Sequence, residues 1–588
     1  MMSKTKVSGY IGLLALILAL PVSAGKPVDN DGDGYKSSLD CNDNNSLVWE
    51  LNSCGVCDVE PVNGCNASNP HSDLSWTDYP NACINCHDGG VGGSQYDEMF
   101  GSTHYQWTGD TPDMVNQGGT LQGKLTNAVN SYCINIEGDW PVCGSCHAGR
   151  GIKPGEGDTN ANVDCLMCHN KDYALNRVRK PDGSMGPSDG TAQVDLDSYV
   201  QNIAAPGRTN CLKCHAYAGG GDGVKRGDIS SALMANSDMH FDVHMNVAGA
   251  NLECQDCHKF DSHRVIGKGS DLRPTDDIVR GAEVTCSSGT CHVGMDSGSG
   301  HASSGRRDEP DRHVARVSCQ SCHIPTYAKD LGDPSHVPTE MHRDWRFHHD
   351  GTPADGVSGA GHPHADKLAN QTPEMRFWNR KSDNYLLHDL GIVDPATGRY
   401  PTSRPIGDVS DGKLMPFKYK TATQPMTVAD DRMIALDTFE YIKGSGDAVA
   451  AIEAGLVNMG YPVNEPYKWI ETDTYQVINH GVNPASDVAA CSQCHEENLD
   501  LTTDSKLDAL GYKLKGPKEQ VCAQCHDGSK NLPRTWDRMH NHVEKGSAGI
   551  GCNFCHDVER VERNLCDPCD SSCSIEYVDN ISYPHQCN

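Results

Sequence analysis

The sequence predicts a mainly α-helical fold with extensive irregular loops and little β-sheet. Two observations carry this prediction. A short cysteine–histidine motif recurs ten times along the 588 residues, and the 60 glycines and 31 prolines interrupt any long apolar–polar alternation. Hydrophobic residues make up only 37% of the chain and aromatic residues 6%, which is little for a protein core. The chain is therefore expected to wrap around an apolar component that it does not itself supply.

The recurring motif is that of covalent haem attachment. In C-x-x-C-H the two thiols add to the porphyrin vinyl groups and the histidine becomes the proximal iron ligand. The nine regular copies are Cys83, Cys86 and His87; Cys143, Cys146 and His147; Cys165, Cys168 and His169; Cys211, Cys214 and His215; Cys254, Cys257 and His258; Cys319, Cys322 and His323; Cys491, Cys494 and His495; Cys522, Cys525 and His526; and Cys552, Cys555 and His556. A tenth, stretched copy consists of Cys286, Cys291 and His292. So many copies leave little room for a zinc or disulfide interpretation, and we expect ten haems of the c type in a multihaem cytochrome c fold.

The N-terminus has the features of a secretory signal. Lys4 and Lys6 precede an apolar run over residues 11–20, and small residues end at Ala24. The run is too short to span a membrane, and no later segment is apolar enough to do so. We expect a signal peptide over residues 1–24 and a periplasmic or extracellular protein without a transmembrane segment.

The net charge of −30 limits the classes of partner. Nucleic acid and anionic membrane are disfavoured by like charge, whereas a basic redox partner is favoured. A cytochrome or a quinol-linked donor would supply electrons, and a small molecule would accept them. An oligomer is compatible with the sequence.

Cysteines outside the motifs form two terminal clusters and one remainder. The clusters are Cys41, Cys54, Cys57 and Cys65, and then Cys566, Cys569, Cys573 and Cys587. In an exported chain, disulfides are the favoured interpretation, with a metal site in the tail as the alternative. Cys133 is left over and is a candidate functional thiol.

An acidic segment near the N-terminus has the spacing of a calcium loop. Its candidate ligands are Asp29, Asp31, Asp33, Asp40 and Asp43. Carboxylates that alternate with glycine converge from a tight turn, as hard oxygen ligands must. The alternative is a solvated acidic linker.

The motifs divide the chain into five parts. After the signal come an acidic disulfide module (25–70), an eight-haem core (71–500), a two-haem extension (501–560) and a cysteine-rich tail (561–588). The core contains a haem-free segment over residues 324–490. Within it, apolar residues at helical spacing predict a packed helix over residues 427–456.

Histidines outside the motifs can supply the sixth ligand of each iron. The candidates are His104, His244, His263, His301, His313, His480 and either His540 or His542. Any one of them could be an ordinary surface histidine, but ten irons favour ligation for most of the set.

Several local strings carry a more specific resemblance. They include Ser131-Tyr-Cys-Ile134, Gly219-Gly-Gly-Asp-Gly-Val-Lys-Arg-Gly-Asp228, Cys322-His-Ile-Pro-Thr-Tyr-Ala328 and Pro416-Phe-Lys418. Over residues 75–500 the chain resembles the octahaem tetrathionate reductase family of c-type cytochromes. The two extra C-terminal motifs, the acidic module and the stretched sixth motif depart from that family.

The resemblance implies a reactive haem at the second motif. It implies that the Lys225 amine is the distal ligand there, with Asp222 and Cys133 beside it, and that the other seven haems have two histidine ligands. Tetrathionate, nitrite and hydroxylamine are the substrates that it implies. A pure electron conduit or filament subunit is the main alternative, and a hydroxylamine oxidase is a third. Without the resemblance, Lys225 and Asp222 would be taken for a solvated loop and Cys133 for a buried structural thiol.

The motif count makes a direct prediction. Intact mass spectrometry of the mature protein should show ten covalent haem additions, including one at the stretched motif of Cys286, Cys291 and His292. Eight or nine additions would mean that this motif or an extension motif is empty.

Overall fold

The computed structural model describes most of the predicted eight-haem core. The described residues are 71–90, 93–116, 121–132, 135, 139–188, 195–267, 284–287, 291–295, 301, 309–329, 339–409, 411–495, 506 and 510. The predicted signal peptide, the calcium module, nearly all of the two-haem extension and the cysteine-rich tail lie outside these residues. What the sequence predicts for them stays a prediction.

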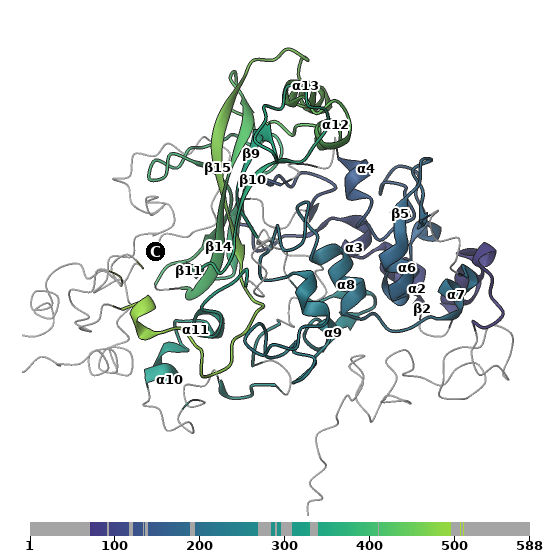
Figure 1. Cartoon of the computed structure of the whole chain (residues 1–588), viewed down its shortest axis with the longest axis horizontal. Coiled ribbons are helices and arrows are strands. Elements are labelled where there is room, and N and C mark those ends of the chain that lie inside the picture. Colours follow the sequence, from purple (N-terminus) through teal and green to yellow (C-terminus); the bar gives the residue numbers. More distant parts are fainter. Residues whose placement is uncertain are drawn as a thin grey trace, which may run out of the picture. The chain divides into compact units, whose positions relative to one another are not determined.

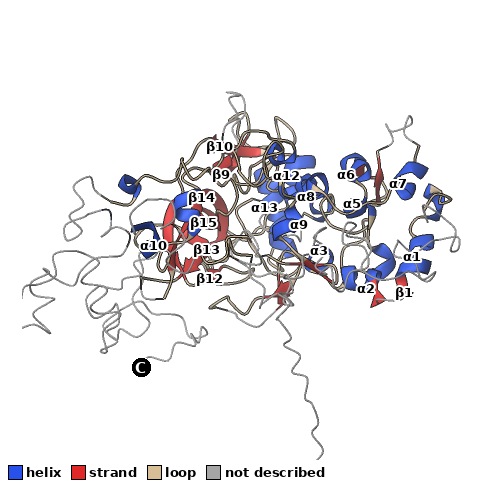
Figure 2. Cartoon of the chain, turned by 90° about the horizontal axis from the view of Figure 1, so that it is seen from below, coloured by secondary structure: helices blue, strands red, loops and turns tan. Residues whose placement is uncertain are grey.

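The described residues form short helices first and a sheet later (Figure 1, Figure 2). The helices are α1 (Asn81–His87), α2 (Gln95–Phe100), α3 (Thr103–Gln106), α4 (Trp140–Cys143), α5 (Leu166–His169), α6 (Lys171–Asn176), α7 (Asp197–Gln201), α8 (Arg208–His215), α9 (Cys254–Cys257), α10 (Glu309–His313), α11 (Cys319–His323), α12 (Thr438–Lys443) and α13 (Ala448–Asn458). Short 3-10 helices lie at Trp76–Asp78, Asn160–Asn162, Ser231–Met234 and Cys491–Gln493.

The strands fall into two groups. Four two-stranded ribbons are formed by β1 (Asp88–Gly90) with β2 (Gly93–Ser94), β3 (Gly109–Asp110) with β4 (Leu121–Gln122), β5 (Arg177–Arg179) with β6 (Met185–Pro187), and β7 (Phe260–Asp261) with β8 (Arg264–Val265). The large sheet contains β9 (Thr339–His348), β10 (Pro363–Leu368), β11 (Glu374–Trp378), β12 (Lys381–Asn384), β13 (Tyr400–Ile406), β14 (Lys413–Thr427) and β15 (Tyr467–Val477).

The seven-stranded sheet shows that the expectation of little β-sheet was wrong. Its order is β10-β9-β14-β15-β13-β12, and β11 also pairs with β14. The β14–β15 pair is antiparallel from Phe417 opposite Val477 to Thr427 opposite Tyr467. The haem-free segment predicted over residues 324–490 is therefore largely a sheet.

Buried charges explain why sequence patterning did not reveal this sheet. Lys418 and Lys420 on β14 are fully buried, and so is Arg404 on β13. Arg404 donates to Asp394 at 3.0 Å and to Asp473 at 2.7 Å. A strand is recognised by apolar residues at alternate positions, and here paired ions occupy several of those positions.

Two short helices replace the single helix predicted over residues 427–456. Asp437 caps α12 by accepting from the amide of Glu440, and Asp447 caps α13 by accepting from the amides of Val449 and Ala450. Between the two helices, Gly446 has a φ of +76°, which a helix cannot contain. Both helices pack on the sheet.

The largest apolar cluster lies where α12 and α13 meet the sheet. Trp345 of β9, Met426 of β14 and Ile470 of β15 are buried there against Tyr441 and Ile452 of the helices. The clusters among the N-terminal helices are smaller, which agrees with a part of the chain whose apolar contacts come from a prosthetic group. Among the described residues, no helix combines the length and apolar character needed to cross a membrane.

The Arg404 network makes a stability prediction. Arg404→Met leaves the carboxylates of Asp394 and Asp473 buried without their cation, and should destabilise the sheet by about 3–5 kcal/mol. Amide hydrogen exchange across β13, β14 and β15 measures the effect. Lys468→Met is the matched control, because Lys468 on β15 and its partner Asp431 are both exposed, at 41% and 43%, and its loss should cost at most about 1 kcal/mol. Equal exchange in both variants would show that the network is not a stabilising element.

Candidate functional site

Histidines of the haem motifs face histidines from distant parts of the chain. The ring centroids are separated by 6.5 Å for His71 and His87, 6.1 Å for His104 and His215, 6.0 Å for His244 and His292, 6.1 Å for His258 and His480, 6.5 Å for His301 and His323, and 6.2 Å for His313 and His495. This separation recurs in six pairs whose backbone surroundings differ. A common geometric requirement therefore sets it.

An iron atom between two imidazoles meets that requirement. With metal–nitrogen bonds of roughly 2 Å, two ligand rings on opposite sides of a metal have centroids roughly 6 Å apart. The residues present therefore fit a haem iron with two histidine ligands at each of these motifs. The stretched motif fits as well as the regular ones, since His292 is among the paired residues.

Hydrogen bonds at the rear nitrogen orient several of these rings. The Nδ1 atom of His480 lies 3.1 Å from Asp228, that of His301 lies 2.9 Å from Asp311, and that of His263 lies 2.9 Å from Glu98. A partner on Nδ1 fixes the ring and presents Nε2 to a metal. Burial would raise the pKa of Asp228, but Arg226 and His480 hold that pKa well below its usual range.

His169 of the third motif also has a histidine neighbour, His263. Burial is the main cause that lowers the pKa of His169 to about 4, and the nearby His263 is the second cause. Burial also lowers the pKa of His215 to about 3. These rings are neutral at pH 7, which is the form that binds metal.

The structure thus brings six of the predicted distal histidines to motif histidines. They are His104, His244, His263, His301, His313 and His480. His71, which faces His87, was not among the candidates. It lies just before the first motif in a string that has no other distinguishing feature. Haem ligation by these side chains stays a prediction.

Some of the predicted haem-binding residues lie outside the part of the chain that the structure describes. In the first motif, Cys83 and His87 are described, but the side chain of Cys86 is not. Both motifs of the two-haem extension fall outside completely, together with the candidate distal ligands near them: Cys522, Cys525, His526, Cys552, Cys555, His556, His540 and His542. Covalent attachment at Cys86 and at the two extension motifs therefore stays a prediction, which the haem count by mass spectrometry tests.

His147 of the second motif has different surroundings. Its buried ring is surrounded by Tyr105, Trp107 and Trp140, with centroids at 4.8, 5.5 and 5.0 Å. Nε2 lies 2.6 Å from the Tyr105 carbonyl oxygen, and Nδ1 has no hydrogen-bond partner among the described residues. Burial lowers the pKa of His147 to about 4. No histidine ring of the described residues stacks against this one.

A buried ion pair connects the second motif with the third. Arg177 donates to Asp164 at 2.7 Å, and also to the carbonyl oxygens of His147 and Gly149. Asp164 also accepts from the hydroxyls of Tyr79 and Tyr173. Both charges are satisfied, so the pair can be buried without the cost of an isolated ion.

Thiols of different motifs lie close together, which indicates which motifs are neighbours in space. Cys146 lies near Cys214, Cys211 near Cys254, and Cys286 near Cys319. Cys257 lies near Cys291, and Cys322 lies near Cys494. Cys83 and Cys165 both lie near Tyr96. The contacts run from the second motif through the fourth, fifth, sixth and seventh to the eighth, and they join the first to the third.

Lys225 lies in a cluster of cations around Tyr132. Its Nζ is 5.7 Å from the centroid of the Tyr132 ring, and the Tyr132 hydroxyl donates to the Lys225 carbonyl at 2.9 Å. The Nζ of Lys420 lies 4.0 Å from the same centroid, and the guanidinium carbon of Arg343 lies 5.2 Å from it. Because Tyr132 directly precedes Cys133, the segments that carry two of the candidate catalytic residues meet here. Cys133 itself lies outside the described residues.

Two lysines on β14 hold these segments in place. Lys418 donates to the carbonyl oxygens of Val224 and Lys225, both at 2.9 Å. Lys420 donates to the Ser131 hydroxyl at 2.8 Å and pairs with Glu340 at 2.9 Å. Burial holds the pKa of Lys418 well below its usual value and lowers the pKa of Lys420 to about 8. Residues two apart on a strand face the same side, so one strand anchors both segments.

The glycines of the candidate loop permit its tight course. Gly219 has a φ of +86°, and a Cβ there would lie 3.0 Å from the Tyr132 ring and 3.1 Å from Cβ of Lys225. Asp222 accepts from the Ser231 amide at 2.7 Å and also from the Ser231 hydroxyl. The carboxylate is therefore held by Ser231, a partner that no pattern in the sequence suggested.

The described residues contain no group of three or more His, Cys, Asp or Glu side chains arranged around one metal ion. The predicted calcium ligands Asp29, Asp31, Asp33, Asp40 and Asp43 lie outside those residues. The described cysteine side chains form no disulfide with one another. The disulfides predicted for the terminal clusters fall outside them as well.

These features are typical of a multihaem c-type cytochrome, and the comparisons with known proteins support haem c as the cofactor and electron transfer as the general activity. Residues 361–498 match the family model described as bacterial cytochrome c. The structure is similar to the crystal structure of octaheme cytochrome c from Shewanella oneidensis, with a TM-score of 0.57 and 26% identity. That similarity covers 73% of this chain and 94% of the other. An uncharacterized protein from Archaeoglobus fulgidus is 29% identical, over 31% of this chain and 73% of its own length.

The ring orientations predict two electronic classes of haem. The planes of the His71, His258 and His301 pairs are 19–25° apart, and those of the His104, His244 and His313 pairs are 68–73° apart. Near-parallel rings split the iron d orbitals, whereas near-perpendicular rings leave two of them almost degenerate. Electron paramagnetic resonance of the oxidised protein should therefore show both rhombic and large-g low-spin signals.

Single variants separate the two classes. His71→Met should remove a rhombic signal and leave the large-g signals intact. His313→Met is its counterpart and should do the reverse. A spectrum with only one class of low-spin signal would contradict these ring orientations.

Proposed function

We propose that the chain is a periplasmic or extracellular multihaem reductase for a small sulfur or nitrogen compound. The observation that carries this proposal is the contrast between His147 and the other motif histidines. Seven of the eight core motifs have a histidine positioned to be the sixth iron ligand, and among the described residues His147 has none. A haem with two histidine ligands has no open position and only passes electrons.

Lys225 is the proposed exchangeable ligand of the second haem. An iron whose sixth ligand can leave supplies electrons directly to a bound substrate. An amine binds metal only when it is deprotonated, and a partly buried cluster of cations favours that form. The Lys225 backbone is fixed by Lys418 and Tyr132, so the side chain can leave without moving the loop.

Asp222 and Cys133 have separate proposed roles. Asp222, with Ser231, would hold or pass protons at the face of the site. The Cys133 thiolate would attack the central S–S bond of tetrathionate, which releases one thiosulfate and leaves a mixed disulfide. Two electrons then cleave that disulfide, which regenerates the thiolate and releases the second thiosulfate. Nitrite and hydroxylamine would not need the thiol.

The thiol contacts support an electron path toward this site. They connect the eighth motif to the second through intermediate motifs, and the two extra C-terminal motifs would extend the path toward a cytochrome or quinol-linked donor. The same series of neighbours favours the second candidate function, a pure electron conduit. A conduit requires that the second haem also has two strong ligands and turns over no substrate.

Lys225→Leu distinguishes the two functions. We expect this variant to open or re-ligate one haem, seen as a new high-spin signal in magnetic circular dichroism, and to leave the other haem signals unchanged. The rate of substrate reduction by this variant should change together with the haem ligation. Lys171→Leu is the matched control, since Lys171 is exposed beside Asp172. If Lys225→Leu alters no haem ligation and the original protein reduces none of the three substrates, the conduit is the correct function.

Cys133→Ala tests the thiol separately. It should lower tetrathionate turnover by at least about tenfold, because nucleophilic attack on the S–S bond is lost. Turnover of nitrite and hydroxylamine should stay within about twofold of the original rate. Equal losses on all three substrates would contradict the assigned role.

A further inference from the structure

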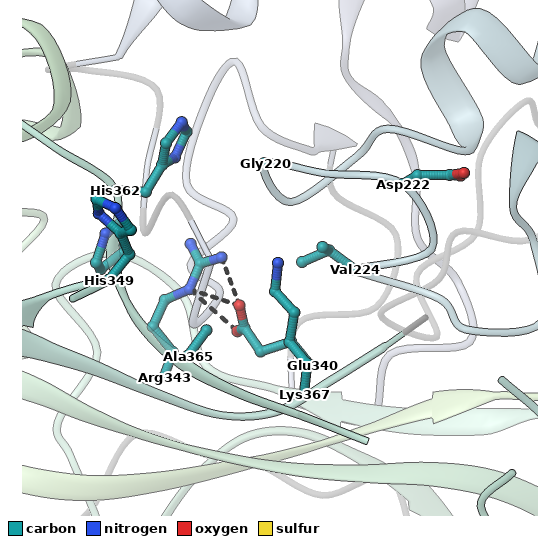
Figure 3. A pocket seen from close by; sticks show the side chains of 10 residues that line it. Gly220, Asp222, Val224, Glu340, Arg343, His349, His362, Ala365 and Lys367 are labelled. Atoms are coloured by element: carbon teal, nitrogen blue, oxygen red, sulfur yellow. Dashed lines mark hydrogen bonds and ion pairs between the residues drawn. The ribbon is translucent and has the colours of Figure 1, made fainter. Parts of the chain in front are cut away.

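A cavity of about 670 Å³ lies beside the loop that carries Lys225 (Figure 3). Gly220 and Val224 of that loop form one wall. The β9–β10 hairpin forms the other wall, with Arg343 on β9 and Lys367 on β10, and His362 lies at its rim. The electron-transfer arrangement described above does not use this cavity.

The geometry of β10 directs Lys367 into the cavity. Pro363, Ala365 and Lys367 of this strand all line the cavity, although the register with β9 shifts after Pro363 and again before Lys367. Lys367 is opposite Glu340 in the β9–β10 register. Its Nζ lies 3.9 Å from the position that a Cβ on Gly221 would occupy, so the amine reaches toward the glycine loop (Figure 3).

Most of the other charged side chains that line the cavity already have hydrogen-bond or ion-pair partners. Arg343 binds the carboxylate of Glu340 at 2.7 Å and the carbonyl oxygens of Tyr132 and Gly219 at 2.5 and 2.7 Å. Lys420 binds Glu340 from the other side. Asp222 is held by Ser231, and Figure 3 shows its carboxylate pointing away from the hairpin.

Lys367 is different. Within the part of the chain that the structure describes, its ammonium group has no hydrogen bond or ion pair, and the rings of His349 and His362 have no hydrogen bond either. His349, His362 and Lys367 are exposed at the mouth of the cavity. Partial desolvation and the nearby Arg343 lower the pKa of His362, so this ring is a neutral donor at pH 7. One uncommitted positive charge and two imidazoles therefore converge on the cavity.

This arrangement suits a small oxyanion. The chain has a net charge of −30, so an anion is repelled over most of the surface. An ammonium group is a compact point charge that binds oxyanions without demanding one orientation. The N–H groups of His349 and His362 can donate to further oxygens of the same anion.

We propose that this cavity is an anion-binding site, in which Lys367 together with His349 and His362 selects oxyanion substrates over neutral ones. This inference rests on the proposed reductase function and deepens it. The site would retain nitrite or tetrathionate beside the Lys225 loop, while uncharged hydroxylamine would gain nothing from it.

Lys367→Gln tests the proposal by kinetics on the full haem-loaded protein. The KM for nitrite and for tetrathionate should rise about threefold to tenfold, as expected when one charged hydrogen bond is lost. The kcat values and the KM for hydroxylamine should stay within about twofold. Lys367→Arg keeps the charge and should restore most of the affinity. Lys381→Gln on β12 is the control, because Lys381 is an exposed lysine of the same sheet outside the cavity.

A binding measurement separates this inference from the reductase function. Calorimetric titration of the oxidised protein with sulfate, a redox-inert oxyanion, should show a site that Lys367→Gln weakens by a similar factor. If turnover is normal but neither sulfate affinity nor the KM for anions depends on Lys367, the anion site is wrong and the reductase function stands. If sulfate binding depends on Lys367 but no substrate turns over, the anion site stands and the reductase function fails.

Discussion

The main constraint on this structure is the distance between facing imidazoles. Six pairs of rings are held with their centroids 6.0–6.5 Å apart, although the paired residues come from separate segments of the chain. That separation is the one an iron atom between the two rings would require. Hydrogen bonds at the rear nitrogen, such as the one between His480 and Asp228, hold individual rings in the necessary orientation.

That constraint accounts for the short helices and many turns of the N-terminal part. The helices that carry the motifs end at or close to the motif histidine, as α1, α5, α8 and α11 do. A longer helix would extend the chain past the motif histidine and would leave too few residues to position the next histidine ring. Packing between protein side chains is then limited to small clusters, and buried pairs such as Arg177 with Asp164 connect neighbouring motifs. The polypeptide positions ligands more than it fills a core.

The sequence predicted which histidines would matter better than it predicted the fold. Seven of the eight motif histidines of the described core lie near a second histidine, and a count of the histidines outside the motifs found most of those partners. His71 was missed because its position shortly before the first motif in the sequence does not reveal that its ring faces His87 in space. The sheet was missed because Lys418, Lys420 and Arg404 occupy buried strand positions where patterning expects apolar residues. Their partners come from distant segments and are visible only in three dimensions.

The anchoring of the Lys225 loop by β14 also has a consequence for the order of folding. Lys418 and Lys420 lie C-terminal to seven of the ten motifs. Their contacts with Val224, Lys225 and Ser131 join segments that are separated by about two to three hundred residues. Contacts of such long range form later than the local turns and short helices that surround each motif. The Lys225 loop therefore reaches its final position only when the sheet has formed.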